Sequence, residues 1–161
     1  MEHYSFSIKG VRQGQFKGEL RNLKGREDWM AGVRFSMQVS VSRDPATGQA
    51  SGKHRHQPLS IVKEWGQASP QILQALATAE LLNPVVLEFT RTGLSGEEAV
   101  FQRVTLTNAL VADVRRYLDF TAAPADSVFR ELEEILFTYQ KITVEDVIGN
   151  TTFADDWFGP A

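Results

Sequence analysis

The stretch from Gly52 to Thr92, GKHRHQPLSIVKEWGQASPQILQALATAELLNPVVLEFTRT, contains a strand pattern, a short helix pattern and a second strand pattern. Ser69 is a favourable N-cap residue, and Pro70 then takes the first helical position, where a missing N–H is harmless. Asn83 can adopt the left-handed conformation that ends a helix, and Pro84 prevents its continuation. We therefore predict one helix in a chain that otherwise reads as strand.

The helix and the strand before it carry apolar side chains suited to packing on a sheet. The helix stripe consists of Ile72, Leu73, Ala75, Leu76 and Ala79. On the strand, Trp65 shares a face with Leu59 and Ile61, so we expect it to pack under the helix. Lys63 and Glu64 point to opposite faces of that strand, which argues against a catalytic pairing between them.

Period-two alternation predicts long strands in the rest of the chain. Residues 29–41 place apolar side chains at odd positions, which indicates one strand with one buried and one solvated face. Residues 104–120 place them at even positions, with a bend or bulge expected near Asn108. Two further apolar faces are formed by Val85, Leu87 and Phe89 and by Ile135, Phe137 and Tyr139, the second with Leu136, Ile142 and Val144 opposite.

Turn residues separate these strands. The segment from Arg43 to Gly52 is a long polar loop, and Gly93 to Gly96 is a hairpin turn. The pattern predicts a mainly β fold, a two-sheet β-barrel of about eight strands flanked by one short α-helix. A length of 161 residues suits a single domain, which we place at residues 1–161.

Composition narrows the function classes. A net charge of −3 with scattered Lys and Arg predicts no nucleic-acid partner, and zero cysteines exclude disulfides and thiolate metal sites. The longest apolar runs fall well short of the ~20 residues of a membrane span, so we expect no membrane insertion. The start of the sequence, MEHYSFSIKG, lacks the features of a secretory signal peptide. We expect any export to proceed without a cleaved signal.

Two polar groups hint at metal binding. His54 and His56 would share a face of a strand, but a zinc site requires three or four ligands and His3 is the one other histidine. Asp155 and Asp156 lack the spacing of a calcium loop. We interpret the histidines as solvated loop residues and the aspartates as a charged, exposed tail.

The last part of the chain is rich in aromatic residues. Phe153, Trp157 and Phe158 lie in a short segment that cannot bury them by its own folding. They either pack back on the same barrel or dock on a neighbouring molecule. Elsewhere, Ser95 lies in a hairpin turn rather than in the strand-to-helix turn of a hydrolase nucleophile.

Several segments together resemble a known family. In order they are YSFSIKG (4–10), HQPLSIVKEWGQASPQILQAL (56–76), VVLEFTRTG (85–93), VTLTNALVADVRRY (104–117), FTYQKITVED (137–146) and TTFADDW (151–157). The chain resembles the Hcp proteins, which are the tube proteins of the bacterial type VI secretion system. That resemblance implies a non-enzymatic structural protein with the same kind of β-barrel.

The resemblance also implies partners and location. Hcp proteins form hexameric rings that stack into a tube inside a contractile sheath, topped by a spike protein, and effector proteins can travel in the channel. Such a protein is cytoplasmic until firing and is then secreted. The polar loop would reach a neighbouring ring or subunit. The candidate contact residues are Asp44, Gln49, Lys53, Arg55, His56, Phe153 and Trp157.

Two other functions stay open. A small-ligand-binding β-barrel would need a roomy apolar cavity, whereas this chain fills an inward face with large side chains. A small hydrolase would need a nucleophile with a partnered base, which the sequence does not assemble. We therefore predict no catalytic, cofactor-binding or metal site. Size in solution separates a monomeric barrel from a ring.

Overall fold

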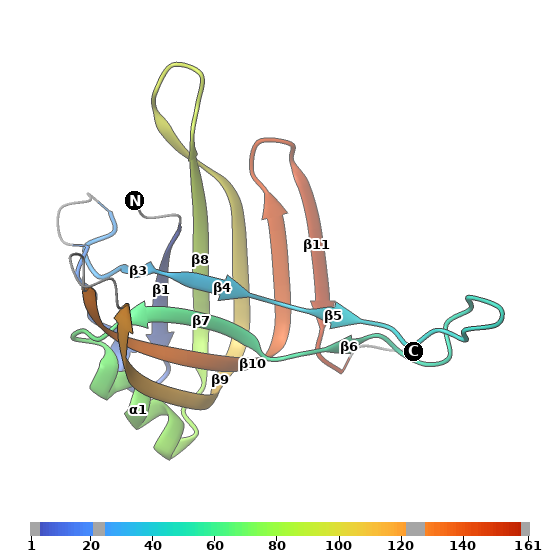
Figure 1. The fold of residues 1–161 in the computed structure, drawn as a ribbon, viewed down its shortest axis with the longest axis horizontal. Helices are drawn as coiled ribbons and strands as arrows, with labels where there is room; N and C mark the ends of the chain where they lie inside the picture. Colours follow the sequence, from blue (N-terminus) through green and yellow to red (C-terminus); the bar gives the residue numbers. More distant parts are fainter. Residues whose placement is uncertain (1–3, 21–24, 122–127, 159–161) are drawn as a thin grey trace.

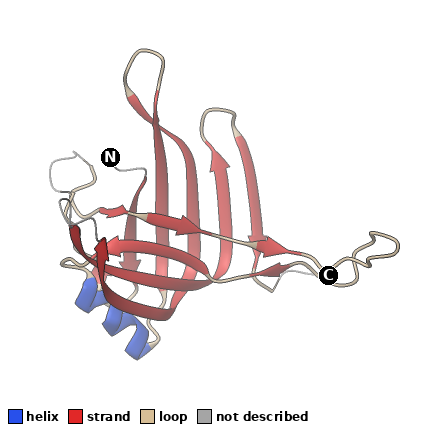
Figure 2. Ribbon diagram, in the orientation of Figure 1, coloured by secondary structure: helices blue, strands red, loops and turns tan. Residues whose placement is uncertain are grey.

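The computed structural model describes residues 4–20, 25–121 and 128–158, so His3 lies outside it. This part of the chain forms eleven strands and one helix (Figures 1 and 2). In chain order they are β1 (Tyr4–Gly10), β2 (Gly14–Gln15), β3 (Met30–Gly32), β4 (Arg34–Ser36), β5 (Val39–Ser40), β6 (Arg55–His56), β7 (Leu59–Glu64), α1 (Ser69–Thr78), β8 (Leu82–Thr92), β9 (Glu98–Thr121), β10 (Val128–Asp146) and β11 (Thr151–Asp156). The predicted fold class is confirmed. No helix among these residues is long and apolar enough to cross a membrane.

One curled antiparallel sheet makes up most of the molecule, with the strand order β2-β1-β8-β9-β10-β7-β4. The long strands β9 and β10 belong to both layers of the barrel. The first half of β9 pairs with β8, whereas the first half of β10 pairs with β7 and its second half pairs with β11. In Figure 1 the two layers therefore cross, with β7 running over the strands behind it.

A bend in β9 and β10 carries these strands from one layer to the other. A bend or bulge was expected near Asn108. This residue has a positive φ of 49°, and its side-chain amide donates a hydrogen bond to Gln140 Oε1 at 2.7 Å. The buried side chains of β9 stand at even positions before the bend, as in Val104 and Leu106, and at odd positions after it, as in Ala109 and Val111. β9 nevertheless continues as one strand. On β10 the same shift buries Ile142 in the core and packs Val144 against it, although both were predicted on the opposite face.

The segment 29–41 differs from the single strand that was predicted. It divides into β3, β4 and β5, because β3 pairs with β1 in one layer and β4 pairs with β7 in the other. The segment thereby joins the two ends of the curled sheet. Met30 is fully buried although it belongs to the predicted solvated face, whereas Phe35 and Met37 pack against the core as expected.

The helix starts and ends at other residues than predicted. Ala68 is the N-cap, and the Ser69 hydroxyl instead accepts from Gly66 N–H at 3.0 Å and donates to Glu133 at 2.7 Å. Ala79, with φ of 51°, ends the helix. Asn83 belongs to β8, because Leu82 is buried and pairs in the sheet. Of the predicted stripe, Ile72 and Ala75 are buried, Leu76 packs against the core, and Leu73 is exposed.

The core lies between the two layers and beneath α1. Its largest fully buried apolar side chains are Phe6, Phe16, Phe137, Ile8, Met30, Leu59, Ile61, Ile72, Leu82, Leu87 and Leu106. The inward faces predicted for β8 and β10 are confirmed for Val85, Leu87, Ile135, Phe137 and Tyr139. Large side chains thus occupy the space that a ligand would need in a binding barrel.

Candidate functional site

One hairpin projects from the body of the molecule (Figure 1). We call residues 39–56 the projecting hairpin; β5 and β6 pair at its base and form a separate two-stranded sheet. Every side chain from Ser42 to Arg55 is exposed. The hairpin therefore adds almost no apolar surface to the core, and its role lies outside the packing of the barrel.

Backbone hydrogen bonds give the projecting hairpin a defined shape. Arg43 and Ala50 form a β-bridge, and Asp44 N–H donates to Gln49 O at 2.7 Å. The tip closes through Gly48 N–H to Asp44 O at 2.8 Å, while Asp44 Oδ1 accepts from Ala46 N–H at 2.8 Å. Because these bonds form within one chain, a partner would meet a preorganised surface with little ordering entropy left to lose.

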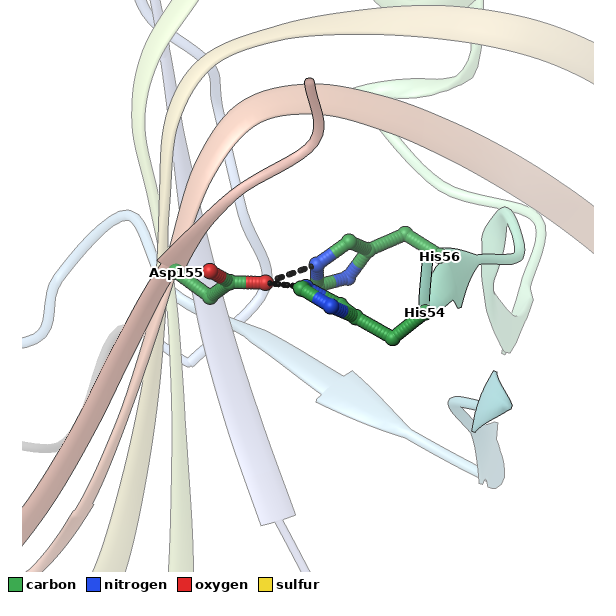
Figure 3. A group of neighbouring side chains, drawn as sticks. All are labelled: His54, His56 and Asp155. Atoms are coloured by element: carbon green, nitrogen blue, oxygen red, sulfur yellow. Dashed lines mark hydrogen bonds and ion pairs between the residues drawn. The ribbon is translucent and has the colours of Figure 1, made fainter. Parts of the chain in front are cut away.

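The C-terminal strand holds the base of the projecting hairpin (Figure 3). Nε2 of His54 and Nε2 of His56 lie 2.5 and 2.6 Å from the same oxygen, Asp155 Oδ2. On the other side of its ring, His56 Nδ1 lies 2.9 Å from the Tyr139 hydroxyl. The His56 ring also stacks on Trp157, with centroids 5.8 Å apart. Residues from β6, β10 and the end of the chain therefore meet at one point.

This arrangement shifts two pKa values. The hydrogen bond from His56 is the main influence that lowers the pKa of Asp155; burial opposes it, and His54 adds to it. Burial, assisted by the negative charge of Asp155, raises the pKa of Tyr139 to about 12. Asp155 is thus a stable anion, and Tyr139 keeps its proton at physiological pH.

The predicted contact residues fall into two groups. Asp44, Gln49, Lys53 and Arg55 are exposed on the projecting hairpin, and Phe153 on β11 is 48% exposed. Trp157 instead packs against the core of its own chain and Tyr139. His56 is not the solvated loop residue that was predicted: it lies on β6 and is 5% exposed. Its two ring nitrogens face Asp155 and Tyr139, so it presents no free polar atom to another molecule.

Asp155 is the residue that sequence reasoning missed. It was interpreted as part of an exposed tail, but β11 pairs with β10 and turns Asp155 toward the histidines, while Asp156 stays exposed. The available signal was alternation: in TTFADDW, Phe153, Asp155 and Trp157 share one face of a strand. An apolar face that includes a carboxylate indicates a polar partner.

Groups that could suggest catalysis have other partners. Lys63 pairs with Glu133 at 2.8 Å, and both side chains are buried, whereas Glu64 pairs with Arg130 outside. The opposite faces predicted for Lys63 and Glu64 are confirmed. Trp65 does not lie under the helix as predicted; it is 36% exposed, with the Arg116 guanidinium 4.2 Å from its ring centroid.

A comparison with protein-family models finds one family over most of the chain. Residues 6–145 match the model described as "Type VI secretion system effector, Hcp". The chain belongs to the Hcp family. The match starts within β1 and stops one residue before the end of β10, and it includes the projecting hairpin and α1.

Individual Hcp relatives agree with this assignment. The chain is 34% identical over 137 residues to the "Major exported protein" of Pseudomonas aeruginosa, covering 85% of this chain and 80% of the relative. A solved structure titled "Crystal structure of Hcp protein" matches with a TM-score of 0.84 at 27% identity over 98% of this chain and 100% of that one. The "Secreted protein Hcp3 from Pseudomonas aeruginosa" matches with a TM-score of 0.77 at 27% identity, covering 98% and 99%. The Hcp fold thus accounts for nearly the whole chain.

Proposed function

We propose that this protein is a tube subunit of a type VI secretion system. Six copies form a ring, rings stack into a tube, and the tube carries effector proteins in its channel. The whole chain acts as one domain and as a structural component rather than an enzyme. Its partners are further copies of itself, the sheath and spike proteins, and the effectors. It stays in the cytoplasm until it is exported without a cleaved signal.

The observation that carries this proposal is the projecting hairpin in a chain of the Hcp family. The hairpin is exposed over residues 42–55, is held in shape by its own hydrogen bonds, and lies away from the barrel. Such a preformed polar surface suits contact with another copy of the chain. Arg43, Lys53 and Arg55 offer charge-assisted hydrogen bonds to acidic groups there.

Size in solution tests the proposal. Size-exclusion chromatography with light scattering should give a particle of six times the chain mass, and negative-stain images should show rings with a central hole. The alternative of a small-ligand-binding β-barrel predicts a monomer. A monomer that persists at high protein concentration would overturn the tube proposal.

A further inference from the structure

Three side chains at the base of the projecting hairpin combine the donor atoms that zinc prefers. His54, His56 and Asp155 each offer one ligand atom, and these atoms all lie within 4.8 Å of one another (Figure 3). Two imidazole nitrogens with one carboxylate oxygen favour zinc and similar transition ions over Mg²⁺ or Ca²⁺, which prefer oxygen ligands. Three protein ligands with an open fourth position form a complete zinc-binding set.

The surroundings orient these ligands. The His56 side chain has no exposed surface, and its Nδ1 faces the Tyr139 hydroxyl at 2.9 Å, so Nε2 is the nitrogen directed at Asp155. Trp157 stacks on the ring from one side. A hydrogen-bonded partner behind a histidine is the usual support for a metal ligand.

We propose that His54, His56 and Asp155 bind a zinc ion, with Tyr139 as the positioning residue behind His56. In tetrahedral zinc sites with bonds near 2.1 Å, ligand atoms lie about 3.4 Å apart. The Nε2–Oδ2 distances of 2.5 and 2.6 Å mean that the ligands must separate by less than about 1 Å when zinc enters. His54 permits this movement because its side chain is 41% exposed.

An open groove lies beside the two histidines. This groove has a volume of about 360 Å³ and is lined by residues 53–57 together with Trp157 and Phe158. Water, or a donor atom from another molecule, can complete the coordination there. Bound zinc would link β6 to β11 and fix the direction of the projecting hairpin. The inference does not rest on ring formation, since all three ligands come from one chain.

The expectation of no metal site rested on a count of histidines and cysteines in the sequence. The fold adds a third ligand to the two histidines, because the pairing of β11 with β10 brings in the Asp155 carboxylate from about a hundred residues away. The third ligand thus depends on tertiary structure.

Calorimetric titration of ZnCl₂ into tag-free, chelator-treated protein at neutral pH tests the site. We expect one zinc ion per chain in the parent protein and at least tenfold weaker binding in Asp155→Asn. The matched control Asp156→Asn removes the same charge from the exposed neighbour and should bind zinc as the parent does. Absence of zinc binding in the parent, or equal loss in both variants, would overturn the proposal.

A second measurement distinguishes the loss of a zinc ligand from the loss of the fold. Cobalt(II) bound in the parent should give the visible absorption of a tetrahedral site, and His54→Ala, whose side chain is partly exposed, should abolish it with the far-ultraviolet circular dichroism unchanged. Tyr139→Phe should weaken zinc binding roughly 10- to 100-fold while keeping the tetrahedral spectrum. An octahedral cobalt(II) spectrum in the parent, or unchanged zinc affinity in His54→Ala, would overturn the proposal. Either result would mean that these three side chains only hydrogen-bond to one another.

Discussion

At the residue scale, the buried carboxylate of Glu133 is the negative charge that pairs with Lys63 beneath α1. Its Oε1 accepts from Lys63 Nζ at 2.8 Å and from the Ser69 hydroxyl at 2.7 Å, while Arg116 Nε lies 3.5 Å from Oε2. Neither Lys63 nor Glu133 has more than 1% of its side chain exposed. Each charge therefore depends on the other, since water cannot replace a lost partner.

Glu133→Gln should lower the free energy of unfolding by about 3–5 kcal/mol, because it leaves the Lys63 ammonium buried without a counter-charge. Glu64→Gln is the matched control. Glu64 is 62% exposed and pairs with Arg130 at the surface, so its loss should change stability by less than about 1 kcal/mol. Urea unfolding measures both values. Similar destabilisation in the two variants would contradict the buried-pair argument.

Glu80 is a second buried carboxylate, and it connects the end of α1 to the β1–β2 turn. It accepts hydrogen bonds from the backbone N–H groups of Arg12 and Gln13 at 3.0 and 2.9 Å, and from the Gln13 side chain at 3.1 Å. Burial acts to raise the pKa of Glu80, but these hydrogen bonds outweigh it and hold the pKa below the ordinary value of 4.5.

Because the folded state lowers this pKa, Glu80 stabilises the fold above pH 4.5, and the contribution disappears as pH falls through the lowered value. We expect Glu80→Gln to melt at a lower temperature than the parent at pH 7. The difference should shrink below pH 4.5 as the parent carboxylate becomes protonated. Melting curves from pH 7 to about 2.5 check this. A difference that stays constant with pH would refute the assignment, and Glu98→Gln, on an exposed residue, is the control.

At the scale of elements, the shared bend in β9 and β10 lets two strands serve two layers. Strands that pass between sheets in crossed β packing require bends or bulges. Asn108 supplies the bend with its positive φ, and a register shift between Leu136 and Phe137 adds a bulge just beyond it. Both features lie where the strands leave one layer for the other.

Replacement of Asn108 should reveal the backbone requirement. Asn108→Val should destabilise the protein by about 1–2 kcal/mol more than Asn108→Gly, because a β-branched residue is strained at a φ of 49° and glycine is not. Both variants lose the hydrogen bond to Gln140 equally, so the comparison isolates the backbone. Equal stability in chemical denaturation would mean that β9 can cross between layers without the left-handed residue.

Local patterns predicted elements better than their boundaries. Period-two alternation correctly located the buried faces of β8 and β10, where Leu87 and Phe137 face the core. It failed at Met30 and Ile142, where pairing across layers turns the strand and changes which parity is buried. The helix end differs from the prediction for a similar reason: Leu82 is buried and pairs with Ala109 in the sheet.

At the scale of the whole molecule, the projecting hairpin lies outside the core, and the proposed function assigns it to contacts between copies of the chain. Replacing residues 44–52 with a tight Asn-Gly turn should leave circular dichroism and melting near those of the parent, because these side chains are exposed. Tube stacking and secretion should be lost. A Gly/Ser segment of the same length is the control for shape, since it keeps the reach but removes the hydrogen bonds of the tip. Normal stacking in the shortened protein would disprove the contact role.

The candidate site was less predictable than the fold. Exposure of Asp44 and Lys53 follows from the composition of the loop. The burial of His56 and the approach of Asp155 do not, because they depend on how β11 and β6 meet through β10. Residues that are distant in the sequence and adjacent in space leave at most a weak alternation signal in a single chain.

The pairing of β1 with β8 has a consequence for the order of folding. Tyr4 lies opposite Phe89 in the sheet, whereas β8, β9, β10 and β11 follow one another as hairpins. Closing the long loop between β1 and β8 is entropically unfavourable until the local hairpins offer an edge. During synthesis, β1 and its nearby partners β2 and β3 therefore leave the ribosome long before β8 exists. We expect the C-terminal meander to nucleate folding, with the N-terminal strand joining last.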